Sequence, residues 1–330
     1  MKAILVGFGF IGRSLVKTIC LKKEILSLFD KEFKLIGVSD LDGYLYDEKG
    51  LSLKKLASIN QISEYSPNFL MEKGSVELIE KCDADLMIET THTNIEDGKP
   101  GLTHMEKAIS KGMHVVTSNK GPLVIEFKKL VHFAEEMGVE FKYEATVAGA
   151  LPIFSLVNEC LQGDEILRIS GILNGTANYI LSKMYFEGTS FELTLKEAQE
   201  RGITESDPTY DIEGIDAACK VVILANAIMK RNVRFKDVKR VGIKRITPEA
   251  VSLAKQSGYV IKLIGTINKN LEVAPKLIPE THPLCVHGTL NVLHLETDLA
   301  KVITIIGYGA GRETVSAMVN DIISIKKKRC

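Results

Sequence analysis

Three glycines in the pattern Gly-x-Gly-x-x-Gly follow the first apolar segment of the chain and strongly restrict how its N-terminal part can fold. The apolar residues 3–6 come first, the turn is Gly-Phe-Gly-Phe-Ile-Gly, and residues 13–21 have the apolar spacing of a helix. Gly7, Gly9 and Gly12 permit a tight turn, close approach of the backbone to a pyrophosphate, and close packing of helix on strand. The order predicts a dinucleotide-binding unit, with a plain packing turn as the alternative.

The next part of the chain alternates short apolar runs with helical patterns. Strands are expected at residues 33–39, 85–89, 113–117 and 140–143, and helices at 102–110 and 123–137. Such alternation predicts a doubly wound parallel sheet of the Rossmann type, which binds ligands beyond the carboxyl ends of its strands. Asp40, Thr91 and Lys120 follow strand ends and are therefore candidates for contacts with a bound nucleotide.

Asp40 bears on the choice between NAD and NADP. An acidic residue after the second strand can bind the adenosine ribose hydroxyls of NAD. Its spacing from Gly12 is longer than usual, because residues 22–32 extend the first crossover, and Asp40 could equally belong to a turn. Lys54 and Lys55 could bind a 2′-phosphate instead. The residues leave both cofactors open.

From residue 144 onward the pattern predicts a second domain of mixed α and β structure, with an open sheet carrying helices on one face. A strand at 166–173 ends at Asn174-Gly175-Thr176, and antiparallel strands are expected at 259–267 and 271–278. We predict a nucleotide-binding domain at 1–143 and a substrate-binding and dimerisation domain at 144–307.

A second glycine-rich turn, at residues 307–311, precedes a helical pattern at 314–325. A terminal helix needs a surface on which to bury its apolar face. We therefore predict that residues 308–330 pack back on the first domain; a plain C-terminal hinge is the alternative.

The segment 198–220 concentrates charged residues around a tight turn. Asp216 and Lys220 lie four residues apart on a helix that begins near Gly214, so their side chains share one face. An exposed ion pair with this spacing is common and contributes little to stability. However, like charges crowd the approach to this helix and are costly unless a cation or polar ligand binds among them. The crowding residues are Glu205, Asp207, Asp211 and Glu213.

Composition argues against several other classes of function. The chain has 42 basic and 42 acidic residues, a balance that gives no support for binding to nucleic acid or to a membrane surface. No apolar run approaches the roughly 18–20 residues that a membrane span needs. The six cysteines form no Cys-x-x-Cys pair and have no metal-ligand spacing, which favours a reduced, cytoplasmic setting.

The segment 198–220 resembles the signature of homoserine dehydrogenases, A-x3-G-[aliphatic]-[small]-x2-[D/N/S]-P-x2-D-[aliphatic]-x-G-x-D-x3-K. The matching positions are Ala198, Gly202, Ile203, Thr204, Asp207, Pro208, Asp211, Ile212, Gly214, Asp216 and Lys220. Supporting motifs are GFGFIG at 7–12, TSNK at 117–120, EATV at 144–147, NGTANYIL at 174–181 and GYGAG at 307–311. The resemblance spans nearly the whole chain and is to the short form without a C-terminal ACT regulatory domain.

This resemblance implies NAD- or NADP-dependent interconversion of L-homoserine and L-aspartate 4-semialdehyde, in threonine, methionine and isoleucine biosynthesis. It implies that Lys220 is catalytic, that Asp216 is its partner, and that Lys120 is a second lysine at the junction of cofactor and substrate. The implied substrate contacts are Glu205, Asp211, Asn174, Gly175 and Thr176. Further nucleotide contacts are implied for Phe10, Ile11, Thr91, Gly202 and Gly311.

The resemblance also implies a monovalent cation, often sodium, bound through backbone oxygens, and a homodimer formed through the second domain. The matching cation positions are Glu144, Val147, Gly149 and Leu151. Relatives usually have Gly-Ala-Gly after the EATV motif, whereas this chain has Ala148-Gly149-Ala150.

Three rival functions make distinguishable demands on the sequence. A semialdehyde or glyceraldehyde phosphate dehydrogenase needs a nucleophilic cysteine, and no cysteine follows a predicted strand end in the first domain. A non-catalytic nucleotide-sensing protein would have lost Asp216 or Lys220, and both are present. Another NAD(P)-dependent amino acid dehydrogenase, acting on the amine, remains as the alternative that a substrate panel would test.

Overall fold

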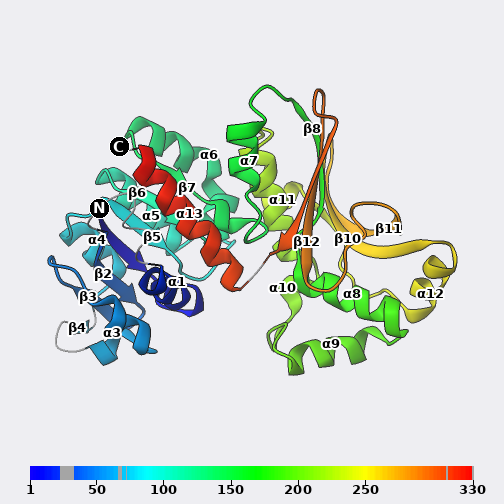
Figure 1. The fold of residues 1–330 in the computed structure, drawn as a ribbon, viewed down its shortest axis with the longest axis horizontal. Coiled ribbons are helices and arrows are strands. Elements are labelled where there is room, and N and C mark those ends of the chain that lie inside the picture. The colour runs from blue at the N-terminus through cyan, green and yellow to red at the C-terminus, as the bar shows by residue number, and fades with distance from the viewer. Residues whose placement is uncertain (23–32, 66–68, 72, 310, 329–330) are drawn as a thin grey trace. The chain divides into compact units, whose positions relative to one another are not determined.

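The structure is a computed structural model that describes residues 1–22, 33–65, 69–71, 73–309 and 311–328 (Figure 1). The chain divides into two compact units, residues 1–149 with 311–330, and residues 150–310. We expected boundaries after residues 143 and 307, a few residues before those of the two units. The first unit continues past residue 143 because Glu144–Thr146 packs against the C-terminal helix. The second unit continues past residue 307 because its last strand extends to Tyr308. The extension of the first crossover at 22–32 falls almost wholly outside the described residues.

The first unit contains a seven-stranded sheet with the order β4-β3-β2-β1-β5-β6-β7. Strands β1, β2, β5, β6 and β7 are parallel, and β3 and β4 form an antiparallel edge. The expected doubly wound sheet is therefore present, with two edge strands that the sequence patterns did not indicate. The strands are β1 (Lys2–Val6), β2 (Lys34–Asp40), β3 (Gly43–Tyr46), β4 (Phe69–Met71), β5 (Leu86–Glu89), β6 (His114–Thr117) and β7 (Phe141–Lys142).

The helices of the first unit bury apolar residues against this sheet. They are α1 (Phe10–Leu21), α3 (Leu53–Ser58), α4 (Ser75–Lys81), α5 (Gly101–Ser110), α6 (Lys120–Glu136) and α13 (Arg312–Lys328), with short 3-10 turns at Ile62–Tyr65 and Glu144–Thr146. Helix α6 begins before the predicted residue 123, and Glu126 interrupts its helical backbone angles.

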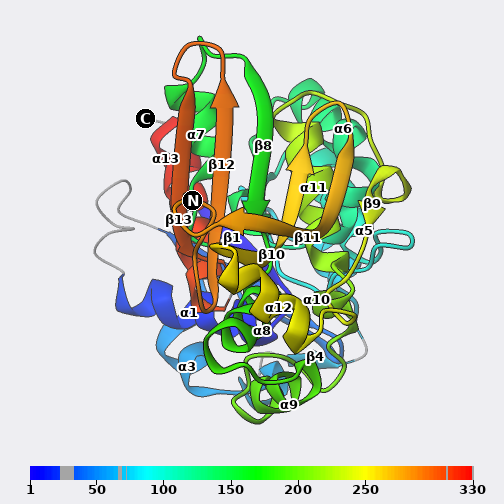
Figure 2. The same cartoon turned by 90° about the vertical axis from the view of Figure 1, so that its right-hand side faces the viewer.

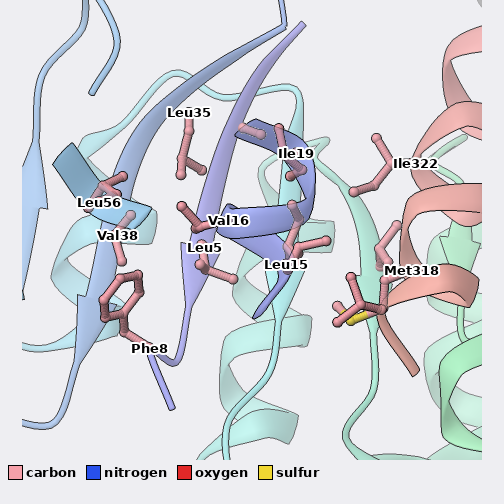
Figure 3. Packing of buried hydrophobic residues seen from close by; sticks show 14 of the residues in the cluster. Leu5, Phe8, Leu15, Val16, Ile19, Leu35, Val38, Leu56, Met318 and Ile322 are labelled. Carbon is pink, nitrogen blue, oxygen red and sulfur yellow. The ribbon is translucent and has the colours of Figure 1, made fainter. Parts of the chain in front are cut away.

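The C-terminal helix α13 completes the core of the first unit. Met318 and Ile322 on α13 belong to the same buried cluster as Leu15 and Ile19 on α1 and Leu5 on β1 (Figure 3). Removing this apolar surface from water stabilises the unit by about 25 cal/mol per Å². The last segment of the chain is thus an integral layer of the N-terminal unit.

The second unit contains a six-stranded sheet with the order β13-β12-β8-β10-β11-β9 (Figure 2). All neighbouring pairs are antiparallel except β9 with β11. The strands are β8 (Ile166–Ile172), β9 (Lys239–Arg240), β10 (Tyr259–Ile267), β11 (Leu271–Pro279), β12 (Leu290–Thr297) and β13 (Val302–Tyr308). The helices are α7 (Ile153–Cys160), α8 (Gly175–Glu187), α9 (Phe191–Glu200), α10 (Thr209–Ile212), α11 (Ile215–Ala227) and α12 (Pro248–Gln256), with a 3-10 turn at Phe235–Asp237.

Helices contact both faces of strand β10, whereas the sequence pattern predicted helices on one face of the sheet. On β10, the Lys262 side chain contacts Asn178 of α8, whereas a Cβ on Gly265 would lie 2.9 Å from Val221 of α11. Residues 262 and 265 point to opposite faces because side chains alternate along a strand. Helix α11 is almost completely buried from Ala217 to Ala227, which places its polar residues in a desolvated setting.

Candidate active site

The glycine turn after β1 is closely packed at two of its glycines and open at the third. A Cβ on Gly7, whose φ is 98°, would lie 2.8 Å from the backbone of Thr90, and one on Gly12 would lie 2.2 Å from the carbonyl oxygen of Gly7. A Cβ on Gly9 would meet nothing within 4 Å. Two glycines are thus needed for packing, and the third leaves open space beside the backbone.

Gly9 is the N-cap of helix α1 and has no side chain, so no side-chain hydrogen bond caps the first N–H groups of the helix. Unpaired N–H groups at a helix N-terminus favour an anion. The turn is held in place by Thr90, whose hydroxyl donates to the carbonyl oxygen of Gly7 at 2.8 Å. Phe10, the first residue of α1, is exposed, and Ile11 is half-buried. These residues fit the pyrophosphate of a dinucleotide.

Asp40 is the last residue of β2 and lies beside this turn. Ser39 pairs with Val6 of β1, and the Ser39 carbonyl oxygen accepts a 2.9 Å hydrogen bond from the Gly7 N–H. Asp40 therefore ends the strand next to the glycine turn, the position at which sheets of this type carry the acidic residue that contacts a ribose. Of the two nearby lysines, Lys55 lies over the ring of Tyr65, with its Nζ 4.5 Å from the ring centre.

Thr91 and Lys120 follow the neighbouring strands β5 and β6. The Thr91 backbone N–H donates to Glu89 Oε1 at 2.8 Å. Lys120 is the first residue of α6, whose N-cap is Asn119; the Asn119 side chain accepts from the Gly121 N–H at 3.0 Å. A 3.1 Å hydrogen bond from Asn119 Nδ2 to Thr91 Oγ1 joins the two strand ends. The structure thus brings the Thr91 and Lys120 segments together.

Lys220 and Asp216 form a buried ion pair on α11. Lys220 Nζ lies 2.7 Å from Asp216 Oδ2 and 2.5 Å from the carbonyl oxygen of Leu173, and only 6% of Lys220 is exposed. This low exposure distinguishes the pair from the weak surface pairs with the same spacing. The Leu173 carbonyl, at the end of β8, had no signal in the sequence because every residue type supplies one.

Asn174 connects this ion pair to Asp211. Its Nδ2 donates to Asp211 Oδ1 at 2.7 Å and to Asp216 Oδ2 at 3.0 Å, while its Oδ1 accepts from the Ala177 N–H and caps α8. Thr204, a position matched only as a small residue of the signature, donates its hydroxyl to Asp211 Oδ2 at 3.1 Å. One polar network therefore joins the ends of β8, α10 and α11.

The two residues after Asn174 sit at the start of α8. A Cβ on Gly175 would lie 2.8 Å from the carbonyl oxygen of Thr289, so glycine is needed for this close approach. The Thr176 hydroxyl donates to the carbonyl oxygen of Ile203 at 3.3 Å. Thr176 therefore connects α8 to the loop that begins at Gly202, a left-handed residue with φ 66°.

The other carboxylates of the segment have different surroundings. Asp207 is exposed and accepts hydrogen bonds from the Thr209 N–H and hydroxyl, which lower the pKa of its carboxyl group. Its role is to stabilise the start of α10. Glu205 is exposed, and among the described residues no hydrogen bond to its carboxylate is seen. The crowding of charges thus resolves into a network around Asp211 and Asp216, a turn-forming Asp207, and an exposed Glu205.

Three of the four candidate cation positions lie in the first unit, and Leu151 lies in the second. Glu144 is buried, and its N–H donates to Asp321 Oδ2 on α13 at 3.1 Å. Burial, followed by the neighbouring Glu144 charge, raises the pKa of Asp321 to about 8. Ala148 and Gly149 both have φ 54°, a left-handed conformation that is unfavourable for alanine.

Among the described residues, no cluster of three or more histidine, cysteine, aspartate or glutamate side chains could hold a metal ion. Within the same part of the chain, no helix has both the length and the apolar character needed to cross a membrane.

Comparison with known proteins places these features in a family. A sequence model described as homoserine dehydrogenase matches residues 152–323. The homoserine dehydrogenase of Methanocaldococcus jannaschii is 50% identical over 331 aligned residues, covering 98% of each chain. An NAD(+)-dependent homoserine dehydrogenase of Pseudomonas canavaninivorans is 34% identical, covering 98% of this chain and 96% of that one.

The fold also matches a solved structure named as a member of this family. The crystal structure of a putative homoserine dehydrogenase from Archaeoglobus fulgidus matches with a TM-score of 0.91 and 39% sequence identity, covering 99% of each chain. The agreement extends through both units. The chain belongs to the homoserine dehydrogenase family.

Proposed function

We propose that this chain interconverts L-homoserine and L-aspartate 4-semialdehyde with NAD(P), and that Lys220 acts at the reacting oxygen. The observation that carries the assignment of Lys220 is its buried ammonium group, held by Asp216 and the Leu173 carbonyl next to Asn174. An ammonium has three N–H donors. Among the described residues two of them are used, so one is available to a substrate oxygen.

Lys220 would donate a proton to the aldehyde oxygen in the reducing direction and accept it back in the oxidising direction. In the reducing direction negative charge grows on this oxygen, and a fixed ammonium favours that charge and then protonates the oxygen. Asp216 would balance the charge of Lys220 and hold it in one position. Lys120 would serve as the second cation at the junction between cofactor and substrate.

Asp211 and Glu205 would bind the ammonium group of the amino acid. Each Asp211 oxygen already accepts one hydrogen bond, from Asn174 or Thr204, and a carboxylate oxygen can accept a second. The exposed Glu205 carboxylate is available on the loop after Gly202. Asn174, Gly175 and Thr176 would form the adjoining wall of the substrate pocket.

The nicotinamide dinucleotide, when bound, supplies the hydride acceptor or donor. The open space at Gly9 and the uncapped start of α1 fit its pyrophosphate. The residues proposed to hold it are Gly7, Gly9, Phe10, Ile11, Gly12, Asp40, Thr91, Lys120, Gly202 and Gly311.

Four further properties belong to this proposal. The backbone oxygens of Glu144, Val147, Gly149 and Leu151 would bind a monovalent cation such as sodium. The enzyme would be a homodimer formed through its second unit, would work in the cytoplasm, and would bind neither nucleic acid nor membrane. Activity in sodium chloride compared with choline chloride, and the mass of the protein in solution, would test the first two.

The test of the reaction is oxidation of L-homoserine by the purified protein with NAD and with NADP. We expect Lys220→Ala to abolish turnover while NADH or NADPH binding, followed by fluorescence, is retained. Lys196→Ala is the matched control, because Lys196 is exposed and pairs with Glu200 at 3.9 Å. Unchanged turnover in Lys220→Ala would remove Lys220 from the mechanism. A panel of other amino acids would reveal activity on an amine instead of the alcohol.

A further inference from the structure

Glu89, at the end of β5, is a completely buried carboxylate with an ordered set of partners. Its Oε2 lies 2.9 Å from Nδ1 of His104, a buried residue on α5. Its Oε1 accepts from the Thr91 N–H at 2.8 Å and from the Thr91 hydroxyl. A buried carboxylate is costly unless such partners compensate for lost water.

Asn119 extends this network to the next strand. Its Nδ2 lies 3.5 Å from Glu89 Oε1, 3.1 Å from Thr91 Oγ1 and 3.1 Å from the carbonyl oxygen of His92. Its Oδ1 caps α6, the helix that starts with Lys120. Asn119 therefore connects the Glu89 carboxylate to the start of α6.

Helix α5 is packed directly onto this connection. A Cβ on Gly101, the first residue of α5, would lie 2.5 Å from Asn119 Nδ2. His104 lies one turn further along α5, so the same helix contacts Asn119 and supplies the partner of Glu89. A change at His104 would therefore disturb both the Glu89 carboxylate and the packing of α5 on Asn119.

We propose that His104 is a positioning residue for the reaction. By holding the Glu89 carboxylate in one orientation, His104 fixes Thr91 and Asn119, and through Asn119 the place of Lys120. The inference rests on the proposed function, because the roles of Thr91 and Lys120 at the cofactor come from there.

The Glu89–His104 pair lies at a strand end, a location that favours a role in ligand binding over a purely structural role. The two residues before Glu89 on β5 and the two before Thr117 on β6 are buried and apolar: Met87, Ile88, Val115 and Val116. An apolar pair of similar volume is often as stable as a buried ionisable pair. The polar network instead begins where the strands end, which is where sheets of this type bind their ligands.

The experiment compares His104→Leu, which removes the Nδ1 partner of Glu89, with His104→Asn, whose amide can donate from a similar place. We expect His104→Leu to lower kcat about 10- to 100-fold while KM for L-homoserine changes little, because the Asp211 network lies on other elements. His104→Asn should recover most of kcat. His132→Leu, at an exposed histidine on α6, is the control for loss of a histidine.

Binding of NADH and NADPH, measured by fluorescence, gives a second readout that does not need L-homoserine. We expect His104→Leu to weaken binding on the order of 10-fold and His104→Asn to restore it. Wild-type protein that binds NADH or NADPH but does not oxidise L-homoserine would overturn the proposed function, and the binding readout would then decide the role of His104.

Two results would overturn the role of His104. One is unchanged kcat and cofactor binding in folded His104→Leu. The other is equal loss in His104→Leu and His104→Asn that follows their melting temperatures, which would indicate a structural role. If His104→Leu does not fold, Glu89→Gln takes its place, with the same expected loss of kcat and the same overturning result.

Discussion

Lys220 donates a 2.7 Å hydrogen bond to Asp216, one turn earlier on a helix that is buried almost throughout. The same i,i+4 spacing on an exposed helix contributes only a few tenths of a kcal/mol. On α11 the two charges are largely removed from water, so each depends on the other far more than in an exposed pair.

Breaking the pair from one side should therefore destabilise the protein more than removing both charges. We expect Asp216→Ala to lower the free energy of unfolding by about 3 kcal/mol, and Asp216→Ala with Lys220→Met to recover part of that loss. Urea unfolding would measure both. Lys196→Met, in an exposed pair, should change stability by less than about 1 kcal/mol. Equal losses in the single and double variants would contradict this interpretation.

The glycines of the first turn should separate cofactor binding from folding. Gly9→Ala adds a methyl group into open space, so we expect the melting temperature to stay near that of the wild type while NADH and NADPH bind at least about 10-fold more weakly. Gly12→Ala places the methyl group 2.2 Å from the Gly7 carbonyl and should destabilise the fold itself. Thermal unfolding and cofactor fluorescence distinguish the two. Unimpaired binding in Gly9→Ala would mean that the pyrophosphate lies elsewhere.

Asp40 should oppose NADP. Its carboxylate lies at the strand end expected to contact the ribose, where it would repel a 2′-phosphate. We expect Asp40→Ser to raise the ratio of kcat/KM for NADP to that for NAD by about 10-fold, because a repulsion of about 1.4 kcal/mol is removed. Asp42→Ser, at an exposed neighbouring position, is the control. The interpretation fails if both variants shift the ratio equally or neither does.

Lys262 predicts a pH dependence of stability. Its Nζ, buried on β10, contacts Asn178 Oδ1 at 2.7 Å, Ser182 Oγ at 3.0 Å and His287 Nδ1 at 3.4 Å. Burial lowers the pKa of Lys262 from 10.5 to about 8. Between these values the unfolded chain binds more protons, so the stability contributed by Lys262 is fullest above about pH 10.5 and falls as the pH drops to about 8.

Replacing Lys262 by methionine should remove this dependence. We expect the stability of the wild type relative to Lys262→Met to rise by roughly 3 kcal/mol between about pH 7 and pH 10.5. Urea unfolding at several pH values would measure the difference. Lys269→Met, at an exposed turn, should show no such rise. A parallel pH profile for wild type and Lys262→Met would show that Lys262 is not the group responsible.

The sequence predicted structure best where a local pattern of residue types is compatible with few conformations. The glycine spacing predicted the turn at residues 7–12, and alternating patterns predicted the parallel strands. Strands β3 and β4 were not predicted, because strands of four and three residues are too short to show an alternating pattern. Strand β12 was missed because it buries polar residues, including Asn291 and His294, which interrupt its apolar pattern.

The site was predictable only in part for a related reason. The signature led to Lys220, Asp216 and Asp211, whose spacing along the chain is informative. The Leu173 carbonyl and the Glu89–His104 pair depend on contacts between separate elements, which no local pattern encodes. Thr204 bonds to Asp211 within the same segment, but a threonine at that position does not by itself indicate such a bond. Charge density alone also could not distinguish Asp207, which stabilises a turn, from Asp211, which joins the network.

Because helix α13 belongs to the first unit, that unit is the first to be synthesised but the last to have its whole chain available for folding. Residues 150–310 form a unit that is continuous in the chain, whereas the unit begun by the first 149 residues takes Met318 and Ile322 into its core. At a translation rate of about 5–20 residues per second, the first segment would wait roughly 10–35 s for α13. The unit encoded first therefore exposes part of its core on the ribosome and is the last to complete it.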